Sequence, residues 1–241
     1  MKKKFNTKVI HSGHGPDKET GAVMPPIHLS STFKQTEPGN FEYEYARTKN
    51  PSRDVLEKLL AQIESGDKAF AFASGMSAIN TVCDLFGTNY HIVCSDDVYG
   101  GTRRLFDKVK SNIDVTYIDF DKNINWNDEI KENTKFIWIE TPSNPLMKII
   151  DIKNTVNIAS EFKLPVICDN TFASPYNQRP LELGADMVVS SSTKYLGGHS
   201  DIVGGSIVIK ENKEYAEKIS FIQNAVGAVP SPFDCYLLTR S

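Results

Sequence analysis

Short apolar runs alternate with helical patterns along most of this chain, and that alternation limits the possible folds more than any other feature. Continuous runs of about four to six residues predict strands at 69–73, 91–94, 113–118, 135–140, 165–169, 186–189 and 206–209. Apolar residues at helical spacing predict helices at 52–65, 78–86 and 152–162, with a further helix ending near residue 110. Strands that are apolar throughout and separated by helices are typical of a parallel sheet covered on both faces. The sequence therefore predicts an α/β fold with a mostly parallel sheet.

The first 50 residues show neither a helical nor a strand pattern, and glycines and prolines interrupt them repeatedly. A long irregular segment is usually functional or lies on another surface. We therefore predict two parts: an N-terminal arm over residues 1–50 that lies on a neighbouring subunit, and a large domain over residues 51–241. The first helix of that domain is predicted to take Ser52 as its N-cap and to end at Gly66.

Polar and aromatic side chains follow the predicted strands. They are Ser74-Gly75-Met76, Tyr99, Glu140 to Asn144, Asp169-Asn170 and Ser191 to Lys194. In open α/β sheets ligands bind beyond the carboxyl ends of the strands, so we expect these segments to meet in one crevice. The junction at Ser74-Gly75 opens a predicted helix, whose free backbone N–H groups favour an anion such as a phosphate.

Lys194 follows three small hydroxyl residues and precedes a glycine pair. A lysine in this position can act as a point charge for phosphate or as an amine that condenses with a carbonyl cofactor. The P-loop order is absent because the glycines follow the lysine, and taken alone the residue is typical of a solvated surface lysine. Together with an anion cradle, a carboxylate at Asp169 and an aromatic ring at Tyr99, it meets the requirements of pyridoxal 5′-phosphate.

Composition narrows the class of protein. The chain has 241 residues, of which 40% are hydrophobic and 24% charged, as is typical of globular proteins. A net charge of −3 without an internal basic block argues against nucleic acid as a partner, and no run approaches the roughly 20 apolar residues of a membrane span. The four cysteines form no Cys-x-x-Cys pair and the five histidines show no ligand spacing, which argues against a metal site and a disulfide framework. We predict a cytoplasmic protein that acts on a small molecule.

Six motifs resemble the cysteine/methionine-metabolism family of pyridoxal-phosphate enzymes. They are Tyr45 to Arg53, Phe72 to Met76, Asp97 to Thr102, Glu140 to Pro145, Asp169 to Phe172 and Ser191 to Asp201. The likeness extends from about Thr7 to Arg240. It implies the aspartate-aminotransferase-like fold (fold type I), in which a smaller C-terminal domain follows the large one; that domain is absent from the 241 residues.

The resemblance also implies roles for individual residues. Lys194 would link to the cofactor aldehyde and move protons between substrate carbons, and Asp169 would pair with the pyridine nitrogen. Tyr99 would stack on the ring and assist proton transfer. The phosphate would be held by Gly75, Met76, Ser191 and Thr193 of the same chain and by Tyr45 and Arg47 of the adjacent subunit, with Asn144 near the ring hydroxyl. The implied assembly is a homotetramer built from such homodimers.

Within the family, residues 223–236 and 31–35 are most like those of cystathionine γ-lyases. The implied reaction is the α,γ-elimination of L-cystathionine, an amino-acid substrate, to L-cysteine, 2-oxobutanoate and ammonia. Gly101 argues against a methionine γ-lyase, which typically has cysteine at the matching position. Two alternatives stay open: a cystathionine γ-synthase or β-lyase reaction at the same site, and a non-catalytic chain that binds the cofactor or dimerises, because the family's substrate-carboxylate arginine lies in the C-terminal domain.

Overall fold

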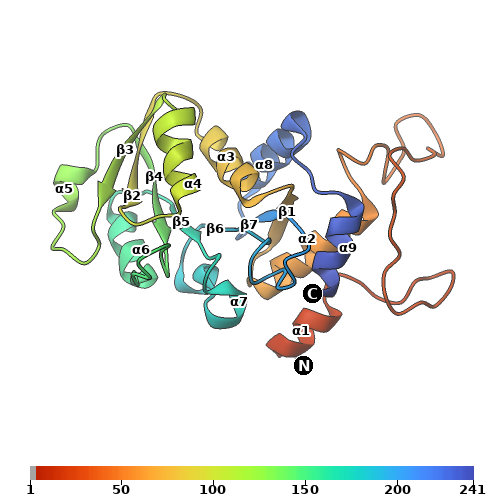
Figure 1. The fold of residues 1–241 in the computed structure, drawn as a ribbon. Coiled ribbons are helices and arrows are strands. Elements are labelled where there is room, and N and C mark those ends of the chain that lie inside the picture. Colours follow the sequence, from red (N-terminus) through yellow and green to blue (C-terminus); the bar gives the residue numbers. More distant parts are fainter. Residues whose placement is uncertain (1–3) are drawn as a thin grey trace.

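A seven-stranded sheet forms the centre of the computed structural model, which describes residues 4–241 (Figure 1). Its strand order is β1-β7-β6-β5-β4-β2-β3. The strands are β1 (Lys68–Phe72), β2 (Tyr90–Ser95), β3 (Ile113–Ile118), β4 (Thr134–Glu140), β5 (Val166–Asp169), β6 (Met187–Ser190) and β7 (Gly205–Ile209). β7 runs antiparallel to its neighbours β1 and β6, and the remaining pairs are parallel. The seven predicted strands and the mostly parallel sheet are confirmed.

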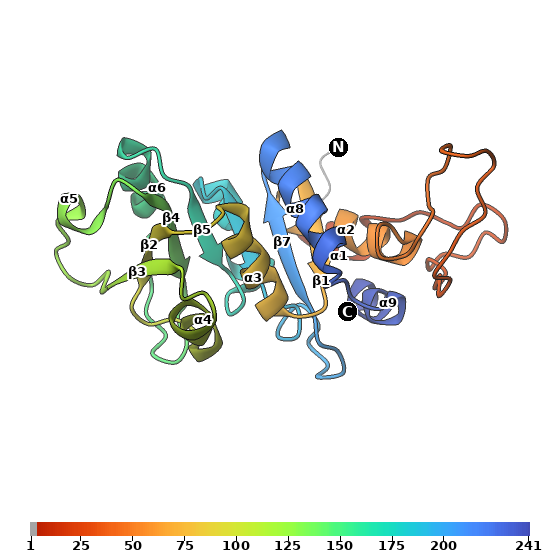
Figure 2. The same ribbon diagram turned by 90° about the horizontal axis from the view of Figure 1, so that it is seen from above.

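Helices cover both faces of this sheet. They are α1 (Phe5–His11), α2 (Pro51–Ile63), α3 (Gly75–Leu85), α4 (Gly100–Arg104) with the π-helix η1 (Leu105–Val109), α5 (Trp126–Glu129), α6 (Ile152–Glu161), α7 (Ser174–Asn177), the 3₁₀-helix η2 (Pro180–Leu183), α8 (Lys213–Val226) and α9 (Pro232–Arg240). One face packs against α3, η1 and α8, and the other against α2, α6 and α9. Figure 2 shows α4 and α6 on opposite sides of the strands. The sheet is thus buried on both faces, as predicted.

Strand β1 illustrates how its sequence fills the two faces. Phe70 and Phe72 point to the side of α3, whereas Ala69 and Ala71 point to the side of α2. All four residues are 3% exposed or less. Burying each phenylalanine contributes roughly 1.5–3 kcal/mol, and the small alanines leave room for α2 to pack closely on the strand. The edge strand is thereby fixed beside the start of α3.

The start of α2 corrects one prediction. Ser52 is not the N-cap: the side chain of Asn50 accepts the N–H groups of Ser52 and Arg53 at 2.9 and 3.3 Å. Pro51 takes the first helical position, where its missing N–H costs nothing. The Ser52 hydroxyl instead accepts the N–H of His28 at 2.9 Å and ties the preceding segment to the helix.

A second correction concerns the segment before residue 50. No helix was predicted there, yet α1 forms, and its Phe5 and Val9 pack against the core cluster under α2. A helix of two turns is too short to show a period or to be stable alone, so its stability comes from this tertiary packing. Between α1 and α2 the chain is irregular, as predicted, and loops away from the body (Figures 1 and 2). Residues 1–3 of the predicted arm lie outside the described residues.

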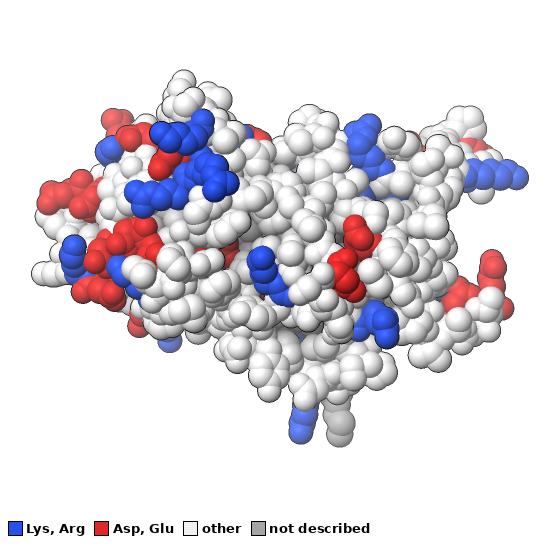
Figure 3. All heavy atoms as spheres, in the orientation of Figure 1, with Lys and Arg blue, Asp and Glu red and all other residues white. Residues whose placement is uncertain are grey.

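Charges on the surface are mixed. Figure 3 shows acidic and basic side chains interspersed on one face, with a basic group over α4, whose last turn carries Arg103 and Arg104. Within residues 4–241, no helix is both long enough and apolar enough to cross a membrane.

Candidate active site

A cavity of about 450 Å³ lies where β4, β5 and β6 end. Glu140 is the last residue of β4, Asp169 is the last of β5, and Ser191 directly follows β6. The ends of parallel strands thus meet at one edge, as expected for the crevice. Eight of the ten residues predicted for the site line this cavity: Gly75, Met76, Tyr99, Asn144, Asp169, Ser191, Thr193 and Lys194.

The N-terminus of α3 forms one wall of the cavity. The side chain of Ser74 caps the helix by accepting the N–H of Ser77 at 3.1 Å. The N–H groups of Gly75 and Met76, in the first turn, have no acceptor within the helix and are oriented to bind an anion. Ser191 packs directly against them, because a Cβ built on Gly75 would lie 2.8 Å from the Cβ of Ser191. Backbone amides and a hydroxyl therefore converge at a position suited to a phosphate.

The turn that carries Lys194 is fixed by hydrogen bonds. The N–H of Lys194 donates to the carbonyl of Ser191 at 3.2 Å, and the N–H of Gly198 donates to the carbonyl of Lys194 at 2.7 Å. The Thr193 hydroxyl donates to the carbonyl of Gly204 at 3.2 Å and accepts its N–H at 3.0 Å. The Lys194 side chain is exposed along the cavity, so its amine is accessible to a small molecule.

Asp169 is a buried carboxylate without a cationic partner among the described residues. It is 6% exposed, and its donors among residues 4–241 both come from Thr171, whose N–H and hydroxyl lie 3.0 and 2.6 Å from Oδ1. Burial raises the pKa of the Asp169 carboxyl, and the hydrogen bonds from Thr171 oppose that shift. A buried carboxylate of this kind is costly unless a positive charge approaches it. Its environment is therefore suited to a cationic ligand group in the cavity.

Glu140 is a site residue to which the sequence analysis assigned no role. It is 5% exposed and stands beside Asp169 in the register of β4 and β5. Its Oε2 accepts the N–H of Tyr99 at 2.8 Å. Burial, followed by the nearby charge of Asp169, raises the pKa of Glu140 to about 8. The sequence did contain a signal for this pair, since both residues end apolar strands whose following segments were expected to meet in one crevice.

Tyr99 lies at the start of α4 with its ring against a glycine. The residue is 47% exposed. A Cβ built on Gly101 would lie 2.4 Å from Cε1 of Tyr99 and 3.0 Å from the sulfur of Met76. The ring can occupy this position only because residue 101 has no side chain. Tyr99 therefore presents an aromatic face to the cavity beside the α3 N-terminus.

Asn144 is placed by a loop that Asp97 holds. The Oδ2 of Asp97 accepts the hydroxyl of Ser143 and, at 2.9 Å, the N–H of Leu146. These two bonds enclose Asn144 and connect the loop after β4 to the loop after β2, which carries Tyr99. The positions of Asn144 and Tyr99 are thereby linked.

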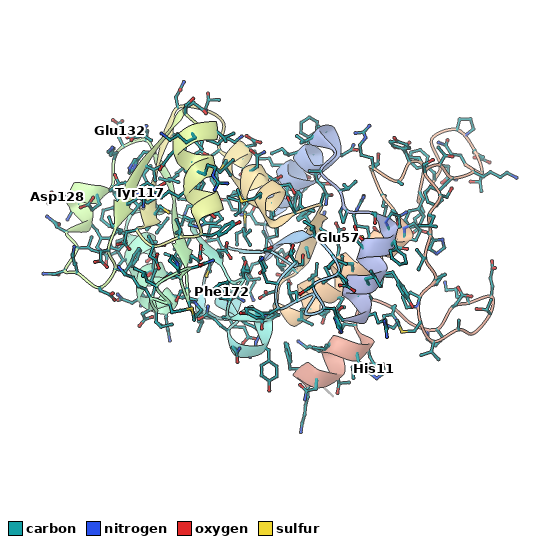
Figure 4. The ribbon with its side chains drawn as sticks, viewed as in Figure 1. His11, Glu57, Tyr117, Asp128, Glu132 and Phe172 are labelled. Atoms are coloured by element: carbon teal, nitrogen blue, oxygen red, sulfur yellow. The ribbon has the colours of Figure 1, made fainter. Side chains whose placement is uncertain are left out.

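Two aromatic residues complete the wall. Phe172, which Figure 4 labels, and Tyr195 both line the cavity and meet edge to face with ring centroids 6.0 Å apart. Phe172 lies in one of the motifs that carry the family resemblance, but its type alone gave no reason to place it at the site.

Tyr45 and Arg47 do not line the cavity of their own chain. Arg47 Nη1 donates to the side-chain oxygen of Asn224 at 3.1 Å and also contacts the Asn224 carbonyl. The Arg47 guanidinium lies 5.4 Å from the centre of the Tyr45 ring, which is 43% exposed. Their predicted role at an adjacent subunit stays a prediction.

The cavity fits pyridoxal phosphate in three respects. The amides at the start of α3 and the Ser191 hydroxyl suit its phosphate, the accessible Lys194 amine suits its aldehyde, and the unpaired Asp169 carboxylate suits its protonated ring nitrogen. By contrast, no group of three or more His, Cys, Asp or Glu in the described part of the chain could hold a metal ion.

Comparison with known proteins places this site in a family. A family model described as Cys/Met metabolism PLP-dependent enzyme matches residues 6–241. Among solved structures, a cystathionine γ-lyase from Lactobacillus plantarum complexed with L-serine superposes with a TM-score of 0.95 and 47% identity, covering 99% of this chain and 63% of that one. The expected fold type I architecture is thereby confirmed.

Curated relatives carry several names at similar identity. A cystathionine γ-lyase from Bacillus subtilis is 49% identical over 100% of this chain and 63% of its own length. A cystathionine β-lyase from Coxiella burnetii is 46% identical over 99% of this chain and 63% of its own length. A probable cystathionine γ-synthase from Herpetosiphon aurantiacus is 48% identical over 98% of this chain and 75% of its own length. The chain thus spans about 63% of the length of the γ-lyase and the β-lyase. It belongs to the family of pyridoxal-phosphate-dependent enzymes of cysteine and methionine metabolism.

Proposed function

We propose that this protein is a trans-sulfuration enzyme that cleaves L-cystathionine by α,γ-elimination to L-cysteine, 2-oxobutanoate and ammonia. The observation that carries the proposal is one cavity lined by Lys194, Asp169 and the N-terminus of α3. The likeness of residues 223–236 to cystathionine γ-lyases supports the γ-elimination, as do the relatives of that name from Bacillus subtilis and Lactobacillus plantarum.

Each side chain has a defined task in this reaction. Bound pyridoxal phosphate supplies an aldehyde for amines and a protonated ring that withdraws electrons from the substrate carbons. Lys194 Nζ would hold the cofactor through its aldehyde and, once freed by the substrate amine, would accept the α proton, pass it on, and then accept a β proton. Asp169 keeps the proton on the ring nitrogen, and Tyr99 covers the ring face and assists proton transfer at its hydroxyl. The N–H groups of Gly75 and Met76, with the Ser191 and Thr193 hydroxyls, would bind the phosphate, and Asn144 would lie near the ring hydroxyl.

Gly101 bears on the choice of substrate. Because a Cβ at this position would lie 2.4 Å from the Tyr99 ring, a cysteine here would displace that ring. Methionine γ-lyases typically have cysteine at the matching position, so the glycine supports the cystathionine reaction over methionine γ-elimination.

The proposed active form is a homodimer, or a homotetramer built from such dimers. In it, Tyr45 and Arg47 of one subunit reach the cofactor phosphate of the other. Their exposure on the chain, away from its own cavity, supports this sharing.

A second candidate is the sister reaction on the same site, γ-replacement on an O-acyl-homoserine or β-elimination of cystathionine. The relatives named cystathionine γ-synthase and β-lyase, at 48% and 46% identity, support this second candidate.

Two measurements test the proposal. Borohydride reduction of the protein with pyridoxal phosphate should fix the cofactor to Lys194, and Lys194→Ala should lower the label to background; Lys210→Ala, at an exposed lysine outside the cavity, is the control.

The second measurement identifies the products. With L-cystathionine, 2-oxobutanoate and cysteine should form, whereas pyruvate and homocysteine would indicate the β-lyase. A product from O-acyl-homoserine plus cysteine would indicate the γ-synthase. Equal labelling of the Lys194→Ala chain would contradict the cofactor assignment, and no product from any of these substrates would leave only a cofactor-binding chain.

A further inference from the structure

A buried arginine outside the cavity holds the turn that carries Tyr45 and Arg47. Arg53, in the first turn of α2, is 3% exposed. Its Nη1 donates to the carbonyl of Ala46 at 2.9 Å, and its Nη2 donates to the carbonyls of Arg47 and Thr48 at 3.1 and 2.8 Å. One guanidinium therefore binds three consecutive carbonyl groups of the turn.

The charge of Arg53 is balanced from inside the body. Glu57, one helical turn later and labelled in Figure 4, places Oε1 3.8 Å from Arg53 Nε. The same oxygen accepts the N–H of Ala71 in β1 at 2.9 Å and the side-chain amide of Gln223 in α8 at 3.2 Å. The turn is thus connected through the buried Arg53 and the half-buried Glu57 to the edge strand and to a helix on the other face of the sheet.

Burial of this ion pair is difficult to explain by stability alone. Desolvating an arginine and a glutamate costs more than packing apolar side chains of similar volume. Within residues 4–241, the Nε of Arg53 has no hydrogen-bond partner although it is buried, which adds to the cost. What the arginine provides and an apolar residue would not is a rigid planar fork of donors that fixes backbone carbonyls.

Backbone hydrogen bonds also order this short turn. The N–H groups of Thr48 and Lys49 both donate to the carbonyl of Tyr45 at 3.0 Å, and the N–H of Ala46 donates to Ser31 at 2.9 Å. The backbone is held by Arg53, and the exposed side chains of Tyr45 and Arg47 lie together, with the guanidinium over the phenol ring and in contact with Asn224 of α8.

We propose that Arg53 is a positioning residue that preforms Tyr45 and Arg47 as an anion-binding pair for the cofactor phosphate of a second copy of this chain. The inference rests on the proposed function, since it assumes that the pair serves the site of a partner. Preorganising the turn before association reduces the ordering cost of binding. Arg53 itself lines no part of the cavity and acts only through the turn.

The first test measures the turn in the chain as it is. Arg53→Lys keeps the charge beside Glu57 but replaces the fork by a single ammonium. Amide hydrogen exchange at Ala46, Thr48 and Lys49 should become about tenfold faster, the effect of losing about one charged hydrogen bond. Exchange in β4 and β5 should not change. The doubly neutral variant Arg53→Gln with Glu57→Gln should show the same local change without leaving an unpaired buried charge. The matched control is Arg179→Lys, because Arg179 also donates to a backbone carbonyl and a glutamate but lies away from the turn.

The second test asks which subunit the arginine serves, with differently tagged chains and pyridoxal-phosphate affinity as the readout. A dimer of a wild-type chain and a chain carrying both Lys194→Ala and Arg53→Lys has one intact lysine, and its site receives the altered turn. We expect about tenfold weaker cofactor binding there. A dimer of an Arg53→Lys chain and a Lys194→Ala chain also has one intact lysine, but its site receives an unaltered turn and should bind as tightly as the wild type.

The outcomes separate this inference from the proposed function. If the second dimer is the weaker one, or if both bind as tightly as the wild type, Arg53 does not act across the interface and the inference is wrong, while the assignment of Lys194 stands. Unchanged exchange in the turn would overturn the inference as well. If the wild-type chain binds no pyridoxal phosphate at Lys194, the proposed function fails, and the exchange measurement still reports on the turn.

Discussion

At the scale of single residues, the cavity is unusual in holding two buried carboxyl groups and one accessible amine. Glu140 and Asp169 are neighbours in the register of two parallel strands. Two adjacent buried carboxylates cannot both be charged at low cost. At Asp169 the two hydrogen bonds to Oδ1 oppose the rise in pKa that burial causes, whereas burial and the charge of Asp169 raise the pKa of Glu140 to about 8. Glu140 therefore carries the proton at neutral pH.

This pair predicts a pH dependence of stability for the cofactor-free chain. The folded pKa of Glu140 is raised above its ordinary value of 4.5, so its contribution to stability is fully present below pH 4.5 and is lost as pH rises through about 8. Glu140→Gln retains the acceptor for the Tyr99 N–H and removes the titration. The free energy of unfolding of the variant should fall less between pH 5 and pH 8 than that of the wild type, as measured by urea denaturation. Glu57 and Glu64, whose pKa values are also raised by burial, affect both proteins equally. Parallel profiles would show that Glu140 is ionised in the folded chain.

Residues at strand ends were the ones that the sequence could reveal. Lys194 and Asp169 follow or end apolar runs, and the geometry of parallel sheets brings such positions together whatever the details of packing. Arg53 could not be recognised in this way. Its partners are backbone carbonyls of a turn without a period, and a helical arginine in a sequence is normally interpreted as a solvated side chain.

At the scale of elements, the docking of α3 against the turn after β6 defines the anion end of the cavity. The closest approach is between Gly75 and Ser191, where an added Cβ would lie 2.8 Å from a Cβ and 3.0 Å from a Cα. A backbone carbon cannot move aside as the end of a flexible side chain can. The helix can therefore approach this turn only with glycine at its first position.

Gly75→Ala should consequently destabilise the chain and weaken phosphate binding. Overpacking of this kind costs roughly 1–3 kcal/mol, and the displaced helix start would weaken pyridoxal-phosphate binding about tenfold for each 1.4 kcal/mol lost there. Urea denaturation and cofactor titration measure the two effects. Gly100→Ala is the matched control, since Gly100 is also the first residue of a helix but has open space around it. Equal stability of the two variants would mean that α3 shifts at no cost.

Elements with long apolar runs were predicted well, and those that depend on tertiary contacts were not. The strands at 113–118 and 134–140 can be recognised from their own residues. The direction of β7 does not follow from its residues, because an apolar run of five residues reads the same in a parallel or antiparallel position. Helix α1 was missed because its stability comes from Phe5 and Val9 packing on α2.

At the scale of the whole molecule, the segment between α1 and α2 carries two predicted site residues that do not reach the cavity of their own chain. Its Tyr45 and Arg47 are exposed, lie outside the cavity of their own chain, and belong to a motif that implies contact with a cofactor phosphate. The remaining eight predicted residues already surround one cavity. The proposed completion of the site by a second copy agrees with this division, since a phosphate at the start of α3 would then gain a cation from the partner.

Mixing two inactive variants tests that division directly. In a dimer of Arg47→Ala and Lys194→Ala chains, the site on the Arg47→Ala chain has its own lysine and receives an intact turn from the partner, whereas the other site lacks both. Borohydride labelling of purified mixed dimers should therefore recover one of the two sites at wild-type affinity, while the Arg47→Ala homodimer binds weakly at both sites and the Lys194→Ala homodimer takes no label. If Arg47 instead served its own chain, no site in the mixed dimer would be complete, and labelling at limiting cofactor would stay at the level of the Arg47→Ala homodimer. Verified mixed dimers without recovery would thus contradict sharing, and would assign Arg47 to the contact with Asn224 that it already makes within its own chain.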